Sequence, residues 1–400
     1  MTLYQTKEEV FILAAKRTAT GSYGGVFSSL TAVDLGVSVV KNLIEASQID
    51  AEKIASIVMG NVVSANLGQN PARQVAILAG LSTQVCATNI NKVCASGMKA
   101  ISILANDLRL DNCQIGVAGG MESMSQTPHY LPKARFGTGY GNVTMIDGLA
   151  KDGLTDVYSQ ASMGVCGDKT AERYHISREE QDDFSEKSFR KAIQAQENNV
   201  FENEIVPITI SSKKGSVSYA TDEQIARANF EKMRSLRPAF SPNGTVTAAN
   251  ASPMNDGASA LLLANSTFVE NEKVKPLAKI IAYAEAEHEP TFFTTAPVSA
   301  TKKVLQKANL SVADIDFFEV NEAFSVVPMV FMQELGIDAE KVNKYGGAVA
   351  LGHALGSSGS RIVVTLLNVL KANKARYGLA AICNGGGGAS AIIIENLYDE

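Results

Sequence analysis

The chain has 400 residues, of which 46% are hydrophobic and 19% are charged. This composition is typical of a globular protein of two or three domains and excludes an intrinsically disordered chain. The 36 basic and 41 acidic residues give a net charge of −5, which argues against a basic nucleic-acid-binding surface over the whole protein.

The first residues and the cysteines of the chain indicate the cellular compartment of the protein. The first residues, MTLYQTKEEV, lack the basic and apolar segments of a secretory signal, and no apolar run reaches the roughly 18 residues of a membrane helix. The five cysteines (Cys86, Cys94, Cys113, Cys166 and Cys383) form no C-x-x-C pair, so neither a zinc ribbon nor a redox dithiol is indicated. A cytoplasmic protein without membrane or nucleic-acid partners is expected.

The predicted elements occur twice along the chain. Residues 38–44 and 299–305 both have the apolar spacing of an amphipathic helix. Each is followed by a turn and an apolar strand, at 54–60 in the first half and at 315–320 in the second. The two sets lie 261 residues apart without a gap. This spacing predicts a duplicated unit.

The repeat continues further along both halves. Ser96-Gly97 and Ser358-Gly359, 262 residues apart, each open an apolar helical run. Each half then reaches a strand that ends in glycines, at 115–120 and at 379–388. Because strands alternate with helices and are apolar on both faces, the expected fold is α/β with mostly parallel sheets.

The segment between the two halves differs from them in amino-acid composition. Residues 123–243 are richer in charge, proline and aromatics, and they include a predicted helix over 177–196. A segment of this length is too long for a structureless loop in a compact protein, so it is expected to carry its own structure. The predicted division is a first half of 1–122 plus 244–274, an inserted domain of 123–243, and a second half of 275–400.

The first candidate site is Cys94, in the stretch NKVCASGMKA. Apolar residues recur at helical spacing after Gly97, so Cys94 is expected at the N-terminus of a helix. The helix dipole and free N–H groups there favour a thiolate, which is the form that attacks a carbonyl carbon. A buried, inert cysteine is the alternative.

The second candidate is His353, in YGGAVALGHALGSSG. Of the four histidines in the chain, only this one is framed by glycines and small residues, so a substrate can approach its ring. Such a histidine can take a proton from a thiol. A histidine that only satisfies loop backbone groups is the alternative.

Two further segments follow predicted strands. Cys383 precedes the glycine run at 385–388, and β-branched residues follow the run. A dinucleotide-binding loop must open a helix, so these glycines instead suit a site of exposed N–H groups that stabilises an oxyanion, or a plain hairpin. Asn321, in the stretch NEAF, is placed to hold a water or to donate to an oxygen, unless it only ends its strand.

Taken together, the four segments resemble the thiolases, and they occur in the family's order over essentially the whole chain. The stretch GTVTAANAS at 244–252 is most similar to short-chain thiolases of the eukaryotic cytosolic type, such as those of fungi. The resemblance implies a layered αβαβα core of two similar halves, with an inserted domain that binds coenzyme A. The implied reaction is a reversible Claisen condensation of two acetyl-CoA to acetoacetyl-CoA and coenzyme A, which would feed isoprenoid or sterol synthesis.

The resemblance also implies roles for the candidate residues. Cys94 would carry the acetyl group as a thioester, and His353 would take its proton and later bind a substrate oxygen. Cys383 would act as the second acid and base. Asn321 would hold a water that completes one oxyanion site with His353. The N–H groups of Cys94 and Gly385 would form the other.

Substrate and metal contacts follow from the same resemblance. The implied coenzyme A and acyl-pocket contacts are Arg227, Asn229, Lys232, Ser252, Met163 and Phe324. No tightly bound cofactor is implied, because coenzyme A is substrate and product. Potassium would bind the carbonyls of Ala248, Ala249, Ala251 and Val349, but Phe189 stands where relatives supply a tyrosine hydroxyl. A homodimer or homotetramer is implied, with residues 124–145 as a contact.

The chain departs from the family at other positions too. Ala354 replaces the usual proline after the histidine, which removes one constraint on that loop. Ala19 also stands in place of proline, and Ser162 in place of a histidine. The competing functions are a degradative 3-ketoacyl-CoA thiolase of broader chain length, a carrier-protein ketosynthase and a non-catalytic coenzyme A-binding protein. Cys383 disfavours the ketosynthase, which uses histidine or asparagine there.

Overall fold

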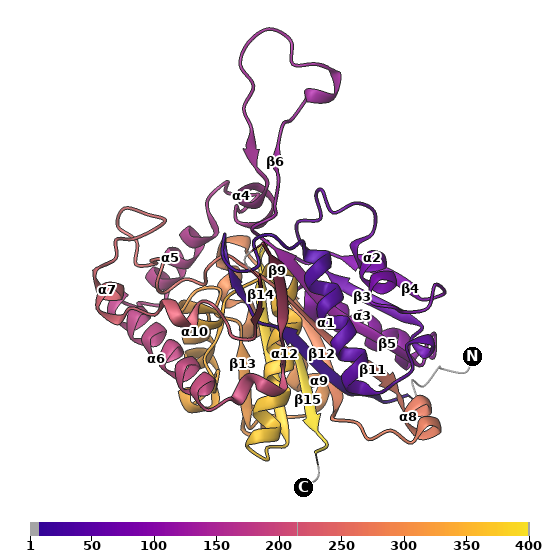
Figure 1. Ribbon diagram of the computed structural model, residues 1–400. Helices are drawn as coiled ribbons and strands as arrows, with labels where there is room; N and C mark the ends of the chain where they lie inside the picture. Colours follow the sequence, from indigo (N-terminus) through magenta and orange to yellow (C-terminus); the bar gives the residue numbers. More distant parts are fainter. Residues whose placement is uncertain (1–7, 214, 399–400) are drawn as a thin grey trace, which may run out of the picture.

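One large sheet runs through the computed structural model, which describes residues 8–213 and 215–398 (Figure 1). Its main strands, in spatial order, are β13 (Phe317–Val320), β14 (Tyr377–Asn384), β15 (Gly388–Asn396), β12 (Ala278–Glu287), β1 (Val10–Thr18), β11 (Asn255–Asn265), β5 (Ile115–Ser123), β3 (Ser56–Gly60) and β4 (Cys86–Ile90). Two short strands join this path: β2 (Gly21–Ser22) pairs with β11, and β8 (Ile205–Val206) pairs with β1.

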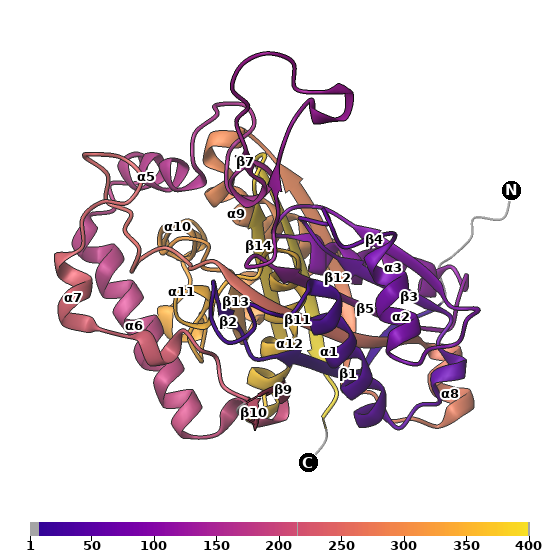
Figure 2. The same ribbon diagram turned by 45° about the horizontal axis from the view of Figure 1, so that its top comes forward.

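Helices divide the molecule into layers on both sides of the sheet (Figure 2). The helices of the two halves are α1 (Ala32–Ser47), α2 (Pro71–Leu78), α3 (Ser96–Arg109), α8 (Ser266–Glu272), α9 (Ala296–Ala308), α10 (Val326–Leu335), α11 (Ala348–Leu351) and α12 (Leu355–Ala372). α1 packs on β1, β5 and β11, and α9 packs on β12, β14 and β15. α3 and α12 pack on each other, and α12 contacts β5 and β11 as well as β13 and β14. The first-half and second-half parts of the sheet therefore lie on either side of α3 and α12, with α1 and α9 outside them, and the expected αβαβα fold is confirmed.

The predicted duplication is visible in the sheet. The order β1-β11-β5-β3 in the first half mirrors β12-β15-β14-β13 in the second, and β1 and β12 join the halves as an antiparallel pair. Both halves have a register shift at the same place, between Ile12 and Ala14 and between Ile280 and Ala282. Equivalent strands therefore carry equivalent irregularities, which is what a copied unit would retain.

Close packing of α3 against α12 depends on two glycines. A Cβ atom on Gly97 would lie 2.6 Å from Ser360 Oγ, and one on Gly359 would lie 2.5 Å from the backbone nitrogen of Met98. A side chain at either position would push the central helices apart. The sequence placed Ser358-Gly359 at the start of a helix, but α12 begins at Leu355, so this pair lies one turn inside it.

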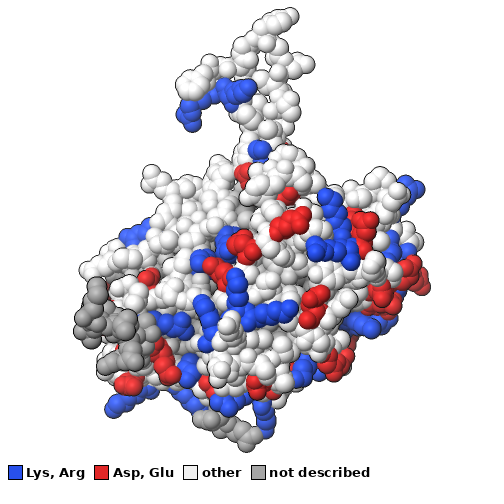
Figure 3. Space-filling view, turned by 180° about the vertical axis from the view of Figure 1, so that it is seen from behind, with Lys and Arg blue, Asp and Glu red and all other residues white. Residues whose placement is uncertain are grey.

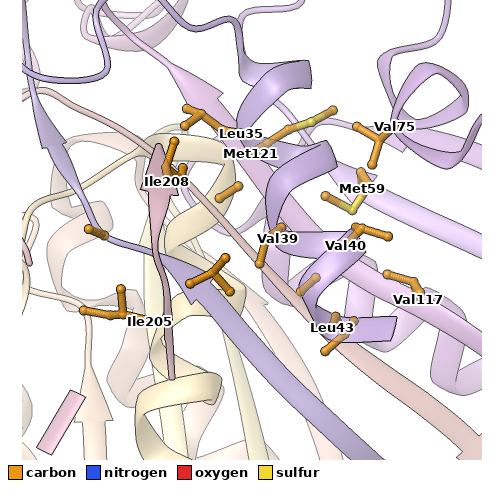
Figure 4. Close-up of a cluster of buried hydrophobic side chains, with 14 of the residues drawn as sticks. Leu35, Val39, Val40, Leu43, Met59, Val75, Val117, Met121, Ile205 and Ile208 are labelled. Carbon is orange, nitrogen blue, oxygen red and sulfur yellow. The ribbon is translucent and has the colours of Figure 1, made fainter. Parts of the chain in front are cut away.

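The hydrophobic core explains why the outer helices form where they do. On α1, Leu35, Val39, Val40 and Leu43 share one face, and the structure buries all four. Figure 4 shows these side chains directed at apolar residues of β3, β5 and the β8 region. Because each such side chain contributes about 1.5–3 kcal/mol when buried, packing rather than intrinsic propensity holds this helix on the sheet.

The segment between β5 and β11 has its own elements. They are the hairpin of β6 (His129–Tyr130) and β7 (Ile146–Asp147), α4 (Gly148–Gly153), α5 (Met163–Arg173), α6 (Arg178–Glu197), the hairpin of β9 (Ile208–Ser212) and β10 (Gly215–Tyr219), and α7 (Phe230–Ser235). The helix predicted over 177–196 is α6, which starts with a capping box between Ser177 and Glu180. The domain limits at 122, 243 and 274 stay predictions.

The surface agrees with the charge balance of the sequence. On the face seen in Figure 3, basic and acidic side chains lie interspersed over the body of the molecule rather than in separate fields. Within the described ranges, no helix combines the length and apolar character needed to cross a membrane.

Candidate active site

A strained turn places Cys94 just before α3. Val93 has a φ of +47°, which is unusual for a β-branched residue and marks a backbone held by its surroundings. Asn91 Oδ1 accepts the N–H of Val93 at 2.8 Å. Ser96 Oγ accepts the N–H of Lys92 at 2.8 Å and donates to Val93 O at 2.6 Å. These bonds fix the backbone on both sides of the Cys94 sulfur.

The acidity of the Cys94 thiol is set mainly by its burial. Burial raises its pKa to about 12, and this effect outweighs the hydrogen bonds from the backbone N–H groups of Gly385 and of Cys94 itself, which lower it. Burial thus opposes the preference for a thiolate that the helix N-terminus gives. A nearby base is required before the sulfur can attack.

His353 is a buried neutral base in the turn between α11 and α12. Ser358 Oγ donates to Ala354 O at 2.8 Å and lies 2.6 Å from His353 Nδ1. Because the hydroxyl has a single proton, we assign the proton of this contact to Nδ1, so Nε2 keeps its lone pair. Nε2 has no partner among the described residues. Burial, helped by the nearby charge of Arg361, lowers the pKa of His353 to about 3.

The structure also shows how the loop of His353 is held without proline. Ala354 has a φ of −73°, within the range that a proline ring imposes. Its carbonyl accepts the N–H groups of Ser357 and Ser358 as well as the Ser358 hydroxyl. Hydrogen bonds therefore supply the constraint that the missing ring would give. Sequence reasoning missed Ser358, because a serine five residues after a histidine carries no recognisable signal.

Cys383 lies beside Cys94, below the surface. It is fully buried at the end of β14, and burial together with the neighbouring Cys94 raises its pKa well above the ordinary value of a thiol. The next residues, Gly385 to Gly387, connect β14 to β15, as the sequence predicted. A Cβ on Gly387, whose φ is +95°, would lie 2.2 Å from His288 O, so only glycine fits there.

Asn321 is the buried polar group of the site. It directly follows β13, and its N–H donates to Ala381 O at 3.0 Å, two residues before Cys383. Both side-chain atoms, Oδ1 and Nδ2, are buried and without a partner among the described residues. An unpaired buried amide is costly, so this side chain is suited to hold a water or a substrate oxygen.

Several of these groups line one cavity of about 380 Å³. Of the predicted site residues, those that line it are Cys94, His353, Gly385, Met163, Phe324, Ser252, Arg227, Ala248 and Ala251. The cavity lining does not include the buried Cys383 and Asn321, nor Asn229 and Lys232. Asn229 instead caps α7 by accepting the N–H of Lys232 at 2.9 Å. Arg227 is half exposed and pairs with Glu223 at 2.7 Å.

The residues of the implied potassium site fit that ion only in part. Asn250, between Ala249 and Ala251, donates through Nδ2 to Asp182 of α6 at 2.9 Å, and α11 with Val349 packs against the same helix. Phe189 of α6 is buried and offers no oxygen. Carbonyl oxygens suit a hard cation, but this set lacks the side-chain oxygen that would complete it.

Comparisons with known proteins agree with this geometry. Residues 10–267 match the thiolase N-terminal domain and residues 274–396 match the thiolase C-terminal domain. An acetyl-CoA acetyltransferase of Schizosaccharomyces pombe is 49% identical, over 97% of this chain and 99% of its own, and a probable acetyl-CoA acetyltransferase of Dictyostelium discoideum is 48% identical over 98% and 94%. The crystal structure of the Ascaris suum thiolase Acat5 in complex with coenzyme A has a TM-score of 0.93 at 44% identity, covering 97% of this chain and all of its own. The chain belongs to the thiolase family.

Proposed function

We propose that this protein is an acetyl-CoA C-acetyltransferase that condenses two acetyl-CoA to acetoacetyl-CoA and free coenzyme A, reversibly. The observation that carries the proposal is that the Cys94 sulfur, the N–H of Gly385 and the free Nε2 of His353 meet at one cavity. Relatives of nearly the same length that carry this activity in their names support the choice.

The first stage transfers an acetyl group to Cys94. His353 Nε2 takes the thiol proton while the sulfur attacks the thioester carbon of acetyl-CoA. The N–H groups of Cys94 and Gly385 stabilise the oxyanion, and one such donor is typically worth about 3–4 kcal/mol. The carbon–sulfur bond to coenzyme A then breaks, and the leaving thiolate takes the proton of Cys383. The stage ends with acetyl-Cys94, a His353 imidazolium and a Cys383 thiolate.

The second stage joins the carbon atoms. The Cys383 thiolate takes an α-proton from a second acetyl-CoA, and the resulting enolate oxygen is held by His353 Nε2–H and a water on Asn321. The enolate carbon attacks the acetyl carbon, and the Cys94 sulfur leaves and recovers its proton from His353. Every proton is thus returned. Because burial raises the pKa of both thiols, each thiolate is a strong base once it forms.

Substrate contacts extend from this centre to the mouth of the cavity. Met163 and Phe324 would enclose the acyl group together with Phe293, which also lines the wall. Ser252 would contact the pantetheine arm. Arg227 would meet the nucleotide phosphates at the mouth, together with Asn229, which caps α7, and Lys232 of that helix. The bulk of the two phenylalanines favours short acyl chains over the long substrates of degradative thiolases.

The chain-length profile of the purified protein tests the reaction. Thiolytic cleavage of acetoacetyl-CoA is expected to exceed that of a long-chain 3-ketoacyl-CoA by at least about tenfold in kcat/KM, because the acyl space is narrow. Faster cleavage of the long substrate would instead indicate a degradative thiolase. Binding of coenzyme A without turnover of either substrate would indicate a non-catalytic protein.

A homo-oligomer in the cytosol is part of the proposal. The segment 124–145 projects from the body (Figure 1), and its tip exposes Phe136 and Tyr140 almost completely. Exposed aromatic side chains on a projecting hairpin are typical of a contact surface, here with another copy of the chain. A relative from Gibberella zeae is named as a cytosolic acetyl-CoA acetyltransferase, which supports the location and a role in supplying sterol and isoprenoid precursors.

A further inference from the structure

Glu122 is a buried carboxylate that takes no part in the steps above. It lies near the end of β5 and is 1% exposed. Its Oε2 accepts the N–H groups of Val62 and Gly356, both at 2.9 Å. Its Oε1 accepts the N–H of Val63 at 3.1 Å and Asn61 Nδ2 at 2.9 Å. Four donors from two separate segments therefore converge on one side chain.

The first of these segments supports the turn of Cys94. Residues 61–63 follow β3, and Val62 O accepts a hydrogen bond from Asn91 Nδ2 at 3.1 Å. Asn91 is also the residue whose Oδ1 holds the strained Val93. A chain of hydrogen bonds thus runs from Glu122 through Val62 and Asn91 to the residue before Cys94.

The second segment is the start of α12. Gly356 is the second residue of this helix and follows His353 by three positions. The close approach of β5 to this turn requires glycine on both sides. A Cβ on Gly120 would lie 1.9 Å from Gly356 O, and one on Gly356 would lie 2.5 Å from Met121 O. The two glycines therefore let β5 approach the start of α12 closely enough for the Glu122 carboxylate to reach the N–H of Gly356.

The duplication shows which part of the first half corresponds to the turn that Glu122 contacts. Gly356 is the counterpart of Cys94 at the offset of 262 residues, so both stand at the start of a central helix. The start of α3 faces the substrate cavity, whereas the start of α12 receives the Glu122 carboxylate, a charge that a helix N-terminus favours. One copy of the helix start carries the nucleophile, and the other is a structural anchor.

We propose that Glu122 is a positioning residue, whose ionised carboxylate fixes the turn of Cys94 relative to the turn of His353. This inference rests on the proposed roles of those two residues. Proton transfer from a thiol to an imidazole depends steeply on their separation, and a displacement of about 1 Å can cost on the order of 100-fold in rate.

Protonation of Glu122 would weaken the arrangement. Burial raises the pKa of this carboxyl to about 7. Its titratable neighbours are Asp256 of β11 and Cys94, while His353 on the facing turn stays neutral. A protonated Glu122 presents a donor where four donors already point, so kcat should fall as the pH drops through about 7.

The variant Glu122→Gln tests the proposal, because it keeps the size and replaces one acceptor oxygen by a donor. We expect kcat to fall on the order of 10- to 100-fold, with KM for acetyl-CoA within about threefold of wild type. Alkylation of Cys94 by iodoacetamide should slow by a similar factor, and the acid limb of the kcat profile near pH 7 should disappear. A folded variant with wild-type kcat and alkylation rate would overturn the proposal.

Two further variants separate positioning from general stability. Asp316 also accepts two backbone N–H groups, from Arg376 and Tyr377, at the other end of β14 from Cys383. Asp316→Asn should lower the thermal midpoint without changing kcat, and a loss of kcat equal to that of Glu122→Gln would refute a specific role. Should Glu122→Gln fail to fold, Asn61→Ala removes one donor and is expected to lower kcat several-fold at constant KM. Wild-type kcat in Asn61→Ala would then overturn the proposal.

Failure of this inference can be told apart from failure of the proposed function. If Cys94→Ala still forms an acetyl-enzyme, the role of Cys94 is wrong and the Glu122 proposal fails with it. If Cys94→Ala blocks acetylation while folded Glu122→Gln behaves as wild type, only the positioning role is wrong.

Discussion

At the scale of single residues, the neighbours of the reactive groups decide their chemistry. Cys94 and Cys383 are both weak acids because burial disfavours the thiolate, and His353 is a weak base for the same reason. Before substrate binds, the three groups are therefore expected to be neutral. Acetyl transfer then creates one positive and one negative charge together, on His353 and Cys383. The orientation of His353 in turn depends on Ser358.

The two cysteines should fail in different ways when replaced. Cys94→Ala is expected to abolish the acetyl-enzyme, because it removes the sulfur that accepts the acetyl group. Cys383→Ser should still form the acetyl-enzyme but lose condensation by at least about 100-fold, because a hydroxyl is a far poorer base. Mass spectrometry after mixing with acetyl-CoA measures the first stage, and acetoacetyl-CoA formation measures the second. Wild-type condensation in Cys383→Ser would remove Cys383 from the mechanism.

The depressed pKa of His353 predicts how stability depends on pH. Its pKa is about 3 in the folded protein and near 6.5 when unfolded, so below about pH 6.5 the unfolded chain binds a proton that the folded one does not. This contribution to stability is therefore lost as the pH falls from about 6.5 toward 3, by up to about 1.4 kcal/mol per pH unit. Between pH 6.5 and 4.5 the thermal midpoint of wild type should fall further than that of His353→Gln. His129→Gln, which replaces an exposed histidine, is the control and should show the same pH dependence as wild type. Equal falls in the thermal midpoint of wild type and His353→Gln would contradict this account.

The missing tyrosine hydroxyl predicts a weak response to potassium. Phe189 lies in α6, the helix whose Asp182 accepts a hydrogen bond from Asn250, so we expect Phe189→Tyr to add the oxygen that the carbonyl set lacks. We expect potassium chloride to increase the rate of Phe189→Tyr at least about twofold more than that of wild type, with sodium chloride as the control. An equal increase in the rates of both proteins would show that residue 189 does not determine the response to potassium.

At the scale of elements, the site depends on where strands end and helices begin. Cys383 closes β14, Asn321 follows β13 and Cys94 precedes α3, so three loops meet at one edge of the layered core. The close contact of α3 with α12 brings the turn of Cys94 next to the turn of His353. That contact depends on glycines rather than on any reactive side chain.

A methyl group at this crossing should damage both stability and activity. Gly97→Ala places a Cβ 2.6 Å from Ser360 Oγ and 2.7 Å from the Ser360 nitrogen, so the helices must move apart. We expect a destabilisation of about 1–3 kcal/mol and a fall in the rate of acetyl-enzyme formation. At Gly257 a Cβ would meet nothing closer than 3.5 Å, so Gly257→Ala is the matched control. Thermal unfolding that shows no difference between the two variants would refute the crossing as a tight contact.

At the scale of the whole molecule, two copies of one α/β unit supply different parts of the site. The first half contributes Cys94 and the second contributes His353, Cys383 and Asn321, so neither half could act alone. The inserted segment closes the cavity with Met163, Ser162 and Arg227. The duplicated scaffold is symmetric in its strands and asymmetric in its loops, where the chemistry lies.

The projecting hairpin should control assembly rather than catalysis within one subunit. Replacing residues 133–143 by a short Gly-Ser link removes the exposed Phe136 and Tyr140, both distant in sequence from the catalytic groups. We expect the molar mass in solution to drop to that of a smaller oligomer, with the acetyl-enzyme still formed. Light scattering coupled to gel filtration gives the mass. An unchanged mass would exclude this hairpin as the contact between copies.

The sequence by itself determined the fold class, the duplication and the residue types of the site, because periodic apolar patterns and short glycine-rich motifs are local properties of a chain. It could not determine the protonation of Cys94, the tautomer of His353 or the convergence of donors on Glu122. Those depend on burial and on contacts between segments far apart in the sequence. The helix N-terminus favours a thiolate at Cys94, and only the tertiary structure reveals the burial that raises the pKa of this thiol.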